Sequence, residues 1–214
     1  MLRSSLALLK WAVMSEKPGL TRAGLIDAAL TLLDEVGLKG LTVRRLAADL
    51  GVKSPALYWH IRTKQELLDG VAEAIVRAAG LGPPHDGEPW QDWLVRRALA
   101  YRAAVLGHRD GALVVASSTR LGAEALELFD AELRALVAEG FTPRLALDTI
   151  SALSHYTTGF LLREQSPPTA GAGPVGALPG TLVAARRAGG GGFETGARLI
   201  VAGAERELAG VTGG

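Results

Sequence analysis

The residues best suited to chemistry lie in one short stretch, Thr42 to His60. Apolar residues recur there at helical spacing on both sides of Gly51, a residue type that accepts the left-handed backbone of a tight turn. The pattern predicts two short helices joined at Gly51, with Leu57 and Ile61 turned inward. Such a unit fits the major groove of DNA, where polar and basic groups reach base edges and phosphates. The side chains left for the outward face are Lys53, Ser54, Ala56, Tyr58 and His60.

Charge is distributed unevenly along the chain. Residues 1–64 hold ten Lys and Arg against five Asp and Glu, whereas residues 65–214 hold thirteen against seventeen. Basic residues that neutralise phosphates release condensed counterions, so a basic N-terminal end is expected of a DNA-binding unit. An ordinary helical hairpin with a solvated basic surface is the alternative interpretation.

Other combinations of reactive residues lack the context that their chemistry needs. The four histidines, His60, His85, His108 and His155, have no metal-ligand spacing, and no cysteine is present for a thiolate site or a disulfide. The glycine-rich stretch at 171–176 matches a dinucleotide-binding pattern, but no predicted strand precedes it. We therefore expect no enzyme, with no catalytic residue, no metal site and no cofactor.

Helical periodicity runs through nearly the whole chain, and no alternating pattern is long enough for a sheet. The predicted fold class is therefore all-α. The head, which we define as residues 20–66, is expected to be a three-helix, helix-turn-helix unit. Its first helix is capped by Thr21 and ended by Gly37, and its third begins with Ser54 as cap and Pro55 in the first turn.

The C-terminal domain, defined as residues 67–214, is expected to consist of long helices. Thr63 is predicted to cap the helix that links the head to this domain. Proline and glycine dominate residues 165–192, which are predicted to be a mobile loop around a short helical piece at 182–187. Apolar periodicity predicts further helices at 90–106, 121–138, 143–164 and 193–208.

The first residues, 1–19, are expected to form an N-terminal arm. Lys10 interrupts their apolar stretch and no small-residue cleavage site follows, so a signal peptide is not expected. No run approaches the ~20 apolar residues that span a bilayer, so we expect no membrane partner and a cytoplasmic location. Two origins stay open for residues 1–13: a functional arm, or a start codon placed upstream of Met14.

Several blocks of sequence resemble the tetracycline-repressor (TetR) family. In the head they are Gly-Leu-Thr-Val-Arg-Arg-Leu-Ala at 40–47 and Leu-Tyr-Trp-His-Ile-Arg-Thr-Lys at 57–64. The similarity continues in Trp-Gln-Asp at 90–92, His-Arg-Asp-Gly at 108–111 and Ser-His at 154–155. Blocks outside the head make this resemblance more specific than a helix-turn-helix alone.

The resemblance implies a ligand-responsive transcriptional repressor, a homodimer that binds palindromic operator DNA and is released by a small-molecule inducer. The helices at 143–164 and 193–208 would pair with their copies in a second subunit as a four-helix bundle. For Trp59, burial in the head is favoured over a DNA contact. The DNA-binding residues implied are Thr42, Arg44, Lys53, Ser54, Pro55, Ala56, Tyr58, His60 and Lys64.

The chain departs from the tetracycline-binding members of that family at their drug and metal ligands. Gly80 and Val115 each stand where those members have a histidine, and Arg163 replaces a glutamate that supports the metal. A hard cation needs oxygen or imidazole ligands, so a magnesium chelate is not expected to bind in the family's way. Arg97, Arg163 and Tyr101 would instead suit an anionic or aromatic ligand. The residues expected to line the ligand site are Arg97, Tyr101, Val115, Thr119, Glu132, Leu147, Ile150 and His155.

Two alternative functions stay open on the sequence. One is an enzyme that uses Glu132 or His155 as an acid or base inside a helical cavity. The other is a constitutive DNA-binding protein that senses nothing, and this alternative requires a filled core in the C-terminal domain.

Overall fold

The computed structural model describes residues 20–120, 122–166, 181 and 192–212, and these residues form helices and no strand. The all-α prediction is therefore confirmed. The predicted arm at 1–19, most of the loop predicted at 165–192 and the helical piece at 182–187 lie outside the described residues.

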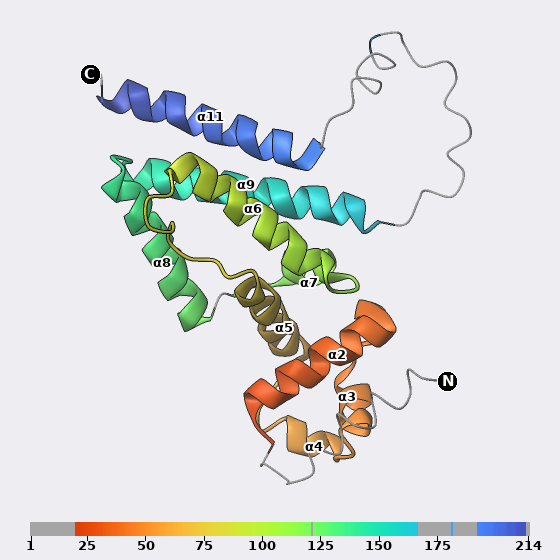
Figure 1. Ribbon diagram of the computed structural model, residues 1–214. Helices are drawn as coiled ribbons and strands as arrows, with labels where there is room; N and C mark the ends of the chain where they lie inside the picture. Colours follow the sequence, from red (N-terminus) through yellow and green to blue (C-terminus); the bar gives the residue numbers. More distant parts are fainter. Residues whose placement is uncertain (1–19, 121, 167–180, 182–191, 213–214) are drawn as a thin grey trace.

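Three helices form the head, at the bottom of Figure 1: α2 (Arg22–Gly40), α3 (Val43–Asp49) and α4 (Ser54–Leu57). Thr21 caps α2 and Thr42 caps α3, because each side-chain oxygen accepts the backbone N–H three residues later, at 3.1 Å. Gly37 interrupts the helical conformation of α2 at φ 72°, and Gly51 makes the turn after α3 at φ 64°. The two caps and the turn at Gly51 agree with the predictions, whereas α2 continues after the kink at Gly37 and ends at Gly40.

The helix α4 is a single turn, and its start differs from the prediction by one residue. Lys53 occupies the N-cap position with no side-chain hydrogen bond, while Ser54 is already helical and Pro55 lies in the first turn. Ser54 is therefore not the cap. Leu57, 1% exposed, fixes the turn to the rest of the head.

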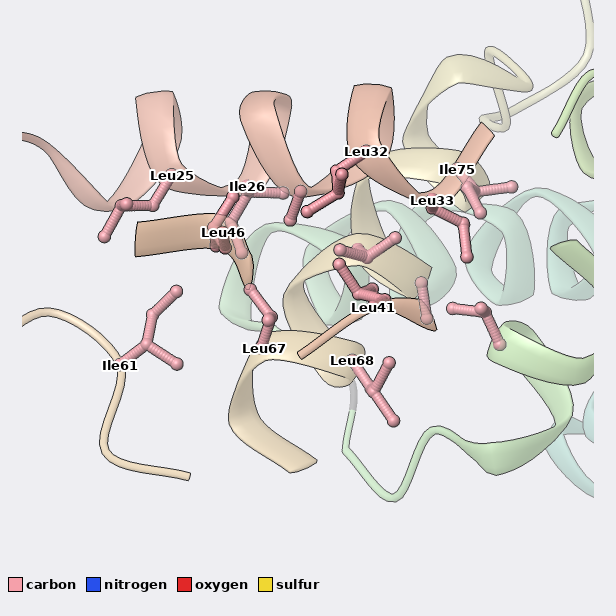
Figure 2. Packing of buried hydrophobic residues seen from close by; sticks show 14 of the residues in the cluster. Leu25, Ile26, Leu32, Leu33, Leu41, Leu46, Ile61, Leu67, Leu68 and Ile75 are labelled. Carbon is pink, nitrogen blue, oxygen red and sulfur yellow. The ribbon is translucent and has the colours of Figure 1, made fainter. Parts of the chain in front are cut away.

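One hydrophobic cluster extends from the head into the C-terminal domain. Figure 2 shows its leucines and isoleucines converging between α2, α3 and the helix α5 (Lys64–Ala78). Leu67 and Val71 of α5 are fully buried in it, and so are Leu25 and Leu33 of α2. Thr63 caps α5 as predicted, by accepting the backbone N–H of Glu66 at 3.0 Å. α5 therefore packs against the head and, in the same cluster, against residues of later helices of the C-terminal domain.

The remaining helices stack above α5 in Figure 1: α6 (Trp90–Leu106), α7 (Gly111–Ser117), α8 (Ala123–Ala138), α9 (Pro143–Glu164) and α11 (Gly192–Thr212). The bounds of α6 and α9 agree with the predicted ranges, and α8 starts two residues later than predicted. α11 lies along α9 and also packs on α6. None of the helices in the described part of the chain combines the length and hydropathy that a bilayer crossing requires.

The helix α7 was not predicted. It is seven residues long and follows Asp110, which has a left-handed backbone at φ 56°. Two turns of helix are too short to show an amphipathic period, so the sequence carries no clear signal for it.

A second connection joins the head to the C-terminal domain, at the turn between α6 and α7. The Asp110 carboxylate accepts the backbone N–H of Leu38 at 2.8 Å. The Asp34 carboxylate accepts the backbone N–H of Arg109 at 3.0 Å, and the Arg109 guanidinium donates to the carbonyl of Glu35 at 2.9 Å. The end of α2 is thus held by this turn as well as by α5.

Candidate functional site

The outward face of the head presents the residues expected to contact DNA. Thr42, through its capping oxygen, is the only one of them that makes a side-chain hydrogen bond within the described chain. None of the nine is buried. Those that are exposed are Thr42, Arg44, Lys53, Pro55, Tyr58 and Lys64, while Ser54, Ala56 and His60 are half-buried. A face with accessible basic, hydroxyl and aromatic groups has the chemistry that phosphates and base edges require.

The expectation for Trp59 is wrong. The Trp59 side chain is 88% exposed, and that of Tyr58 is 51% exposed. Leu57 and Ile61 fill the interior of this segment, so the residues between them turn outward. Trp59 lies instead beside His60 and along a groove between the head and the C-terminal domain.

A cavity of about 370 Å³ lies in the C-terminal domain, between α5, α6, α7, α8, α9 and the segment that follows α7. Its volume is within the range of small-molecule sites. Apolar groups line much of it: Ala72, Val76, Leu81, Val115, Ala125, Leu128 and Phe129. The polar and ionisable groups are Glu73, Arg77, Arg97, Tyr101, Ser118, Thr119, Arg120, Glu132, Ser151, Ser154 and His155.

The structure brings six of the eight residues expected at the ligand site to this cavity; Leu147 and Ile150 do not line it. Ile150 is fully buried in a separate hydrophobic cluster, and Leu147 is 39% exposed. Both lie one helical turn before Ser151 and Ser154, the α9 residues that do line it.

The sequence reasoning missed the contribution of α5 to the cavity wall. Ala72, Glu73, Val76 and Arg77 face the cavity from this helix. A signal was available, because Glu73 and Arg77 are four residues apart and share a helix face that the head cluster leaves free. Their role depends on where α8 lies, and the sequence does not show that.

A buried ion pair forms part of the cavity wall. Arg97 donates from Nε to Oε1 of Glu132 at 2.8 Å, and its Nη2 lies 2.8 Å from Oε2 in the same ion pair. The two side chains are 6% and 1% exposed. Glu132 also accepts the backbone N–H of Gly82 at 3.1 Å, and the carbonyl of Gly82 accepts from Trp93 Nε1 at 2.9 Å. Each charge is thus matched, and the loop before α6 is tied to the pair.

That loop is fixed by a second ion pair, nearer the surface. Arg96 donates from Nε and Nη2 to the two oxygens of Glu88, at 2.6 and 2.7 Å. These hydrogen bonds, with the backbone N–H of His85, lower the pKa of Glu88 to about 2. The loop holds Leu81 against the cavity.

The hydroxyl of Tyr101 adds a neutral polar group to the wall. It lies 3.3 Å from the hydroxyl of Thr158. Burial raises the pKa of Tyr101, so the phenol stays protonated near neutral pH.

One carboxylate links α5 to the segment after α7. Asp69 accepts the backbone N–H of Thr119 at 2.9 Å, the Thr119 hydroxyl at 3.2 Å and the Gln65 amide at 2.9 Å. Burial alone would raise the pKa of Asp69, but these hydrogen bonds outweigh it and lower the pKa. The Gln65 amide also donates to the carbonyl of Ser117 at 2.9 Å. Thr119 lines the cavity, so the connection leads from the cavity to α5.

The expectation of an anionic ligand loses its basis. Arg97 is already neutralised by Glu132, and Arg163 is exposed and does not line the cavity. Within the described ranges, no three His, Cys, Asp or Glu residues are grouped so that they could hold a metal ion.

Comparison with known proteins gives matches in both parts of the chain. Residues 25–71 match the family described as bacterial regulatory proteins, tetR family, and residues 83–185 match the tetracyclin repressor-like C-terminal domain. Tetracycline repressor protein class D of Escherichia coli is 43% identical over 147 residues, which cover 68% of this chain and 67% of that protein.

Two solved structures have a similar fold. A variant TetR from Acinetobacter baumannii AYE, in complex with minocycline, has a TM-score of 0.74 at 36% identity, covering 89% of this chain and 99% of that one. ActR from Streptomyces coelicolor, in complex with (S)-DNPA, has a TM-score of 0.77 at 27% identity, covering 89% and 100%.

The curated relatives are transcriptional regulators, so the enzyme alternative is excluded. The similarity includes the helix-turn-helix head and the helical C-terminal domain, and it extends along most of the chain. The chain therefore belongs to the tetR family of bacterial transcriptional regulators.

Proposed function

We propose that this chain is a ligand-responsive repressor, which binds palindromic operator DNA as a homodimer and is released when a small molecule occupies the cavity. The observation that carries the proposal is the double role of α5. Leu67 and Val71 bury this helix in the core of the head, while Glu73 and Val76 form part of the cavity wall. A ligand that moves α5 therefore moves the head.

The geometry of DNA turns such a movement into a change of affinity. Two heads of a dimer must sit in successive major grooves, about 34–36 Å apart. A ligand that favours a different spacing of the heads lowers the affinity for DNA. Bound DNA lowers the affinity for the ligand by the same factor, because one coupling free energy describes both effects. The presence of a cavity favours this function over constitutive DNA binding, which requires a filled core.

The proposed dimer forms through α9 and α11. These helices lie side by side in Figure 1, and Leu199 of α11 is 70% exposed, while Leu147 of α9 is 39% exposed. Exposed leucines on adjacent helices fit a subunit interface, and a two-fold axis through it would present two heads to a palindrome.

The proposed function is tested by selecting DNA that the full-length protein binds and sequencing it. We expect a palindrome whose half-sites are about one helical turn apart, and fluorescence anisotropy should report release of that DNA by a compound that binds the cavity. Binding to single half-sites by one chain would contradict the proposed dimer. Compounds that bind the cavity and leave the DNA bound would contradict the proposed release.

Two substitutions in the head should have different effects on DNA binding. Lys64→Ala removes a charge placed for phosphates, so binding to every sequence should weaken and the salt slope should fall by about one. Lys53→Ala removes a group placed for base edges, so the protein should lose preference at one or two base pairs, worth about 1–3 kcal/mol. Mobility shifts on the selected and on scrambled duplexes separate the two effects. Unchanged preference in Lys53→Ala would show that this residue reads no base.

Replacing the carboxylate that links the cavity to α5 should weaken release. Asp69→Asn removes the negative charge of the carboxylate that accepts hydrogen bonds from Thr119 and Gln65. A coupling change of 1–3 kcal/mol is typical, so we expect the ligand concentration for half-maximal operator release to rise about tenfold. Ligand binding measured without DNA should change little. Asp92→Asn, at an exposed position of α6, is the matched control. Equal release curves for the two variants would exclude Asp69 from the coupling.

A further inference from the structure

The interior of the cavity contains charged groups but no uncompensated charge among the described residues. Arg97 and Glu132 are the two ionisable lining residues that are both charged and buried, and they neutralise each other through two contacts of 2.8 Å. Glu132 also accepts the backbone N–H of Gly82, which holds the pair from a second side.

The other charged lining residues lie toward the surface. Arg77 pairs with Glu124 at 3.1 Å, where the side chains are 56% and 62% exposed. Arg120 is exposed and Glu73 is half-buried, and neither makes an ion pair in the described part of the chain. Both line the cavity and the groove between the head and the C-terminal domain, so they stand at the edge where the two spaces meet. His155 is exposed on α9. Full charges thus stay in contact with solvent, except for the matched pair.

We propose that the cavity selects ligands with no net charge, with an apolar body and a hydrogen-bond acceptor, and that the Arg97–Glu132 pair sets this selectivity. The inference assumes the proposed function only in that the cavity is the ligand site. A charged ligand would lose its hydration on entering and would find no unpaired opposite charge inside. If an anion displaced Glu132 from Arg97, a buried carboxylate would be left without its partner.

The polar groups that remain available are neutral or act as donors. Nη1 of Arg97 makes no hydrogen bond within the described residues, nor do the hydroxyls of Ser151 and Ser154. A carbonyl or hydroxyl oxygen on the ligand can accept from these groups while the ion pair stays intact. The aliphatic and aromatic side chains around them suit a fused-ring body.

The test uses three ligands with one ring system and different charge: the carboxamide, the carboxylate and the aminomethyl derivative of anthraquinone. Binding to the full-length protein is measured by calorimetry at pH 8 without DNA. The carboxamide should bind at least about tenfold more tightly than either charged form. Equal or tighter binding of the carboxylate to the unmodified protein would overturn the proposal, and so would failure of all three to bind.

Charge variants test the role of the pair directly. Glu132→Gln leaves Arg97 without its counter-ion, so the preference should invert toward the carboxylate. Arg97→Gln should invert it toward the ammonium form. If one single variant is too unstable to measure, the other, which should invert the preference toward the opposite charge, carries the test. An unchanged preference in a folded single variant would exclude the pair as the selective element. Because no DNA is present, these results are independent of whether ligand binding releases an operator.

Discussion

Replacing Glu132 with alanine should lower the free energy of unfolding by about 3–5 kcal/mol, because it leaves the buried guanidinium of Arg97 charged and unpaired. Glu132 is 1% exposed, accepts hydrogen bonds from Arg97 Nε and the backbone N–H of Gly82, and makes a second ion-pair contact with Arg97 Nη2 at 2.8 Å. Urea unfolding at one fixed protein concentration measures the loss, since the stability of a dimer depends on concentration.

The control for that experiment removes both charges at once. Arg97→Met with Glu132→Leu replaces the pair by apolar side chains of similar length, so most of the lost stability should return. A cost below about 1 kcal/mol for Glu132→Ala would mean that the pair is solvated and contributes no more than a surface ion pair.

Tetracycline with magnesium should leave the operator bound at concentrations that saturate tetracycline repressor protein class D. Val115 lines the cavity, and by the sequence resemblance Val115 and Gly80 correspond to histidines of the tetracycline-binding members; a valine cannot ligate a hard cation. Each buried hydrogen-bond partner removed costs about 1–3 kcal/mol, so the combined loss should be several kcal/mol.

Operator release followed by fluorescence anisotropy decides this prediction, with the class D repressor and its own operator as the positive control. The comparison covers tetracycline with magnesium, tetracycline with a chelator and uncharged aromatic compounds. If tetracycline with magnesium is the strongest inducer of this protein, the alignment of the cavity with the tetracycline site is wrong.

Local capping chemistry made much of the helical framework predictable. Thr21, Thr42 and Thr63 each accept a backbone N–H at a helix start, and Gly37 and Gly51 each adopt the positive φ that a glycine tolerates. These signals depend on neighbouring residues, so they can be read without knowledge of the fold. The helix α7 has Asp110 at its N-cap, but its seven residues are too short to show an amphipathic period, so this one residue was not enough to predict it.

The cavity was less predictable, because its properties depend on contacts between distant residues. Arg97 and Glu132 are 35 positions apart, and nothing in either helix indicates that they neutralise each other. The sequence therefore predicted that Arg97 could bind an anionic ligand, whereas in the structure Arg97 is paired with Glu132. Ile150 was expected at the cavity for its apolar position, but the same apolar character places it in the neighbouring hydrophobic cluster.

The most direct measurement of the link between cavity and DNA uses two alanines of α8. Ala125 lines the cavity, whereas Ala123 is exposed and does not. Ala125→Trp should fill part of the cavity, and Ala123→Trp is the matched control with the same added volume.

Operator release is measured by fluorescence anisotropy, with a compound that binds the unmodified protein. We expect the unmodified protein and Ala123→Trp to release the DNA at the same compound concentration, and Ala125→Trp to stay bound. Two results would contradict the proposal that occupancy of the cavity controls DNA binding by the head. One is that Ala125→Trp releases the DNA although it shows no measurable compound binding; the other is that it releases the DNA at the same compound concentration as Ala123→Trp.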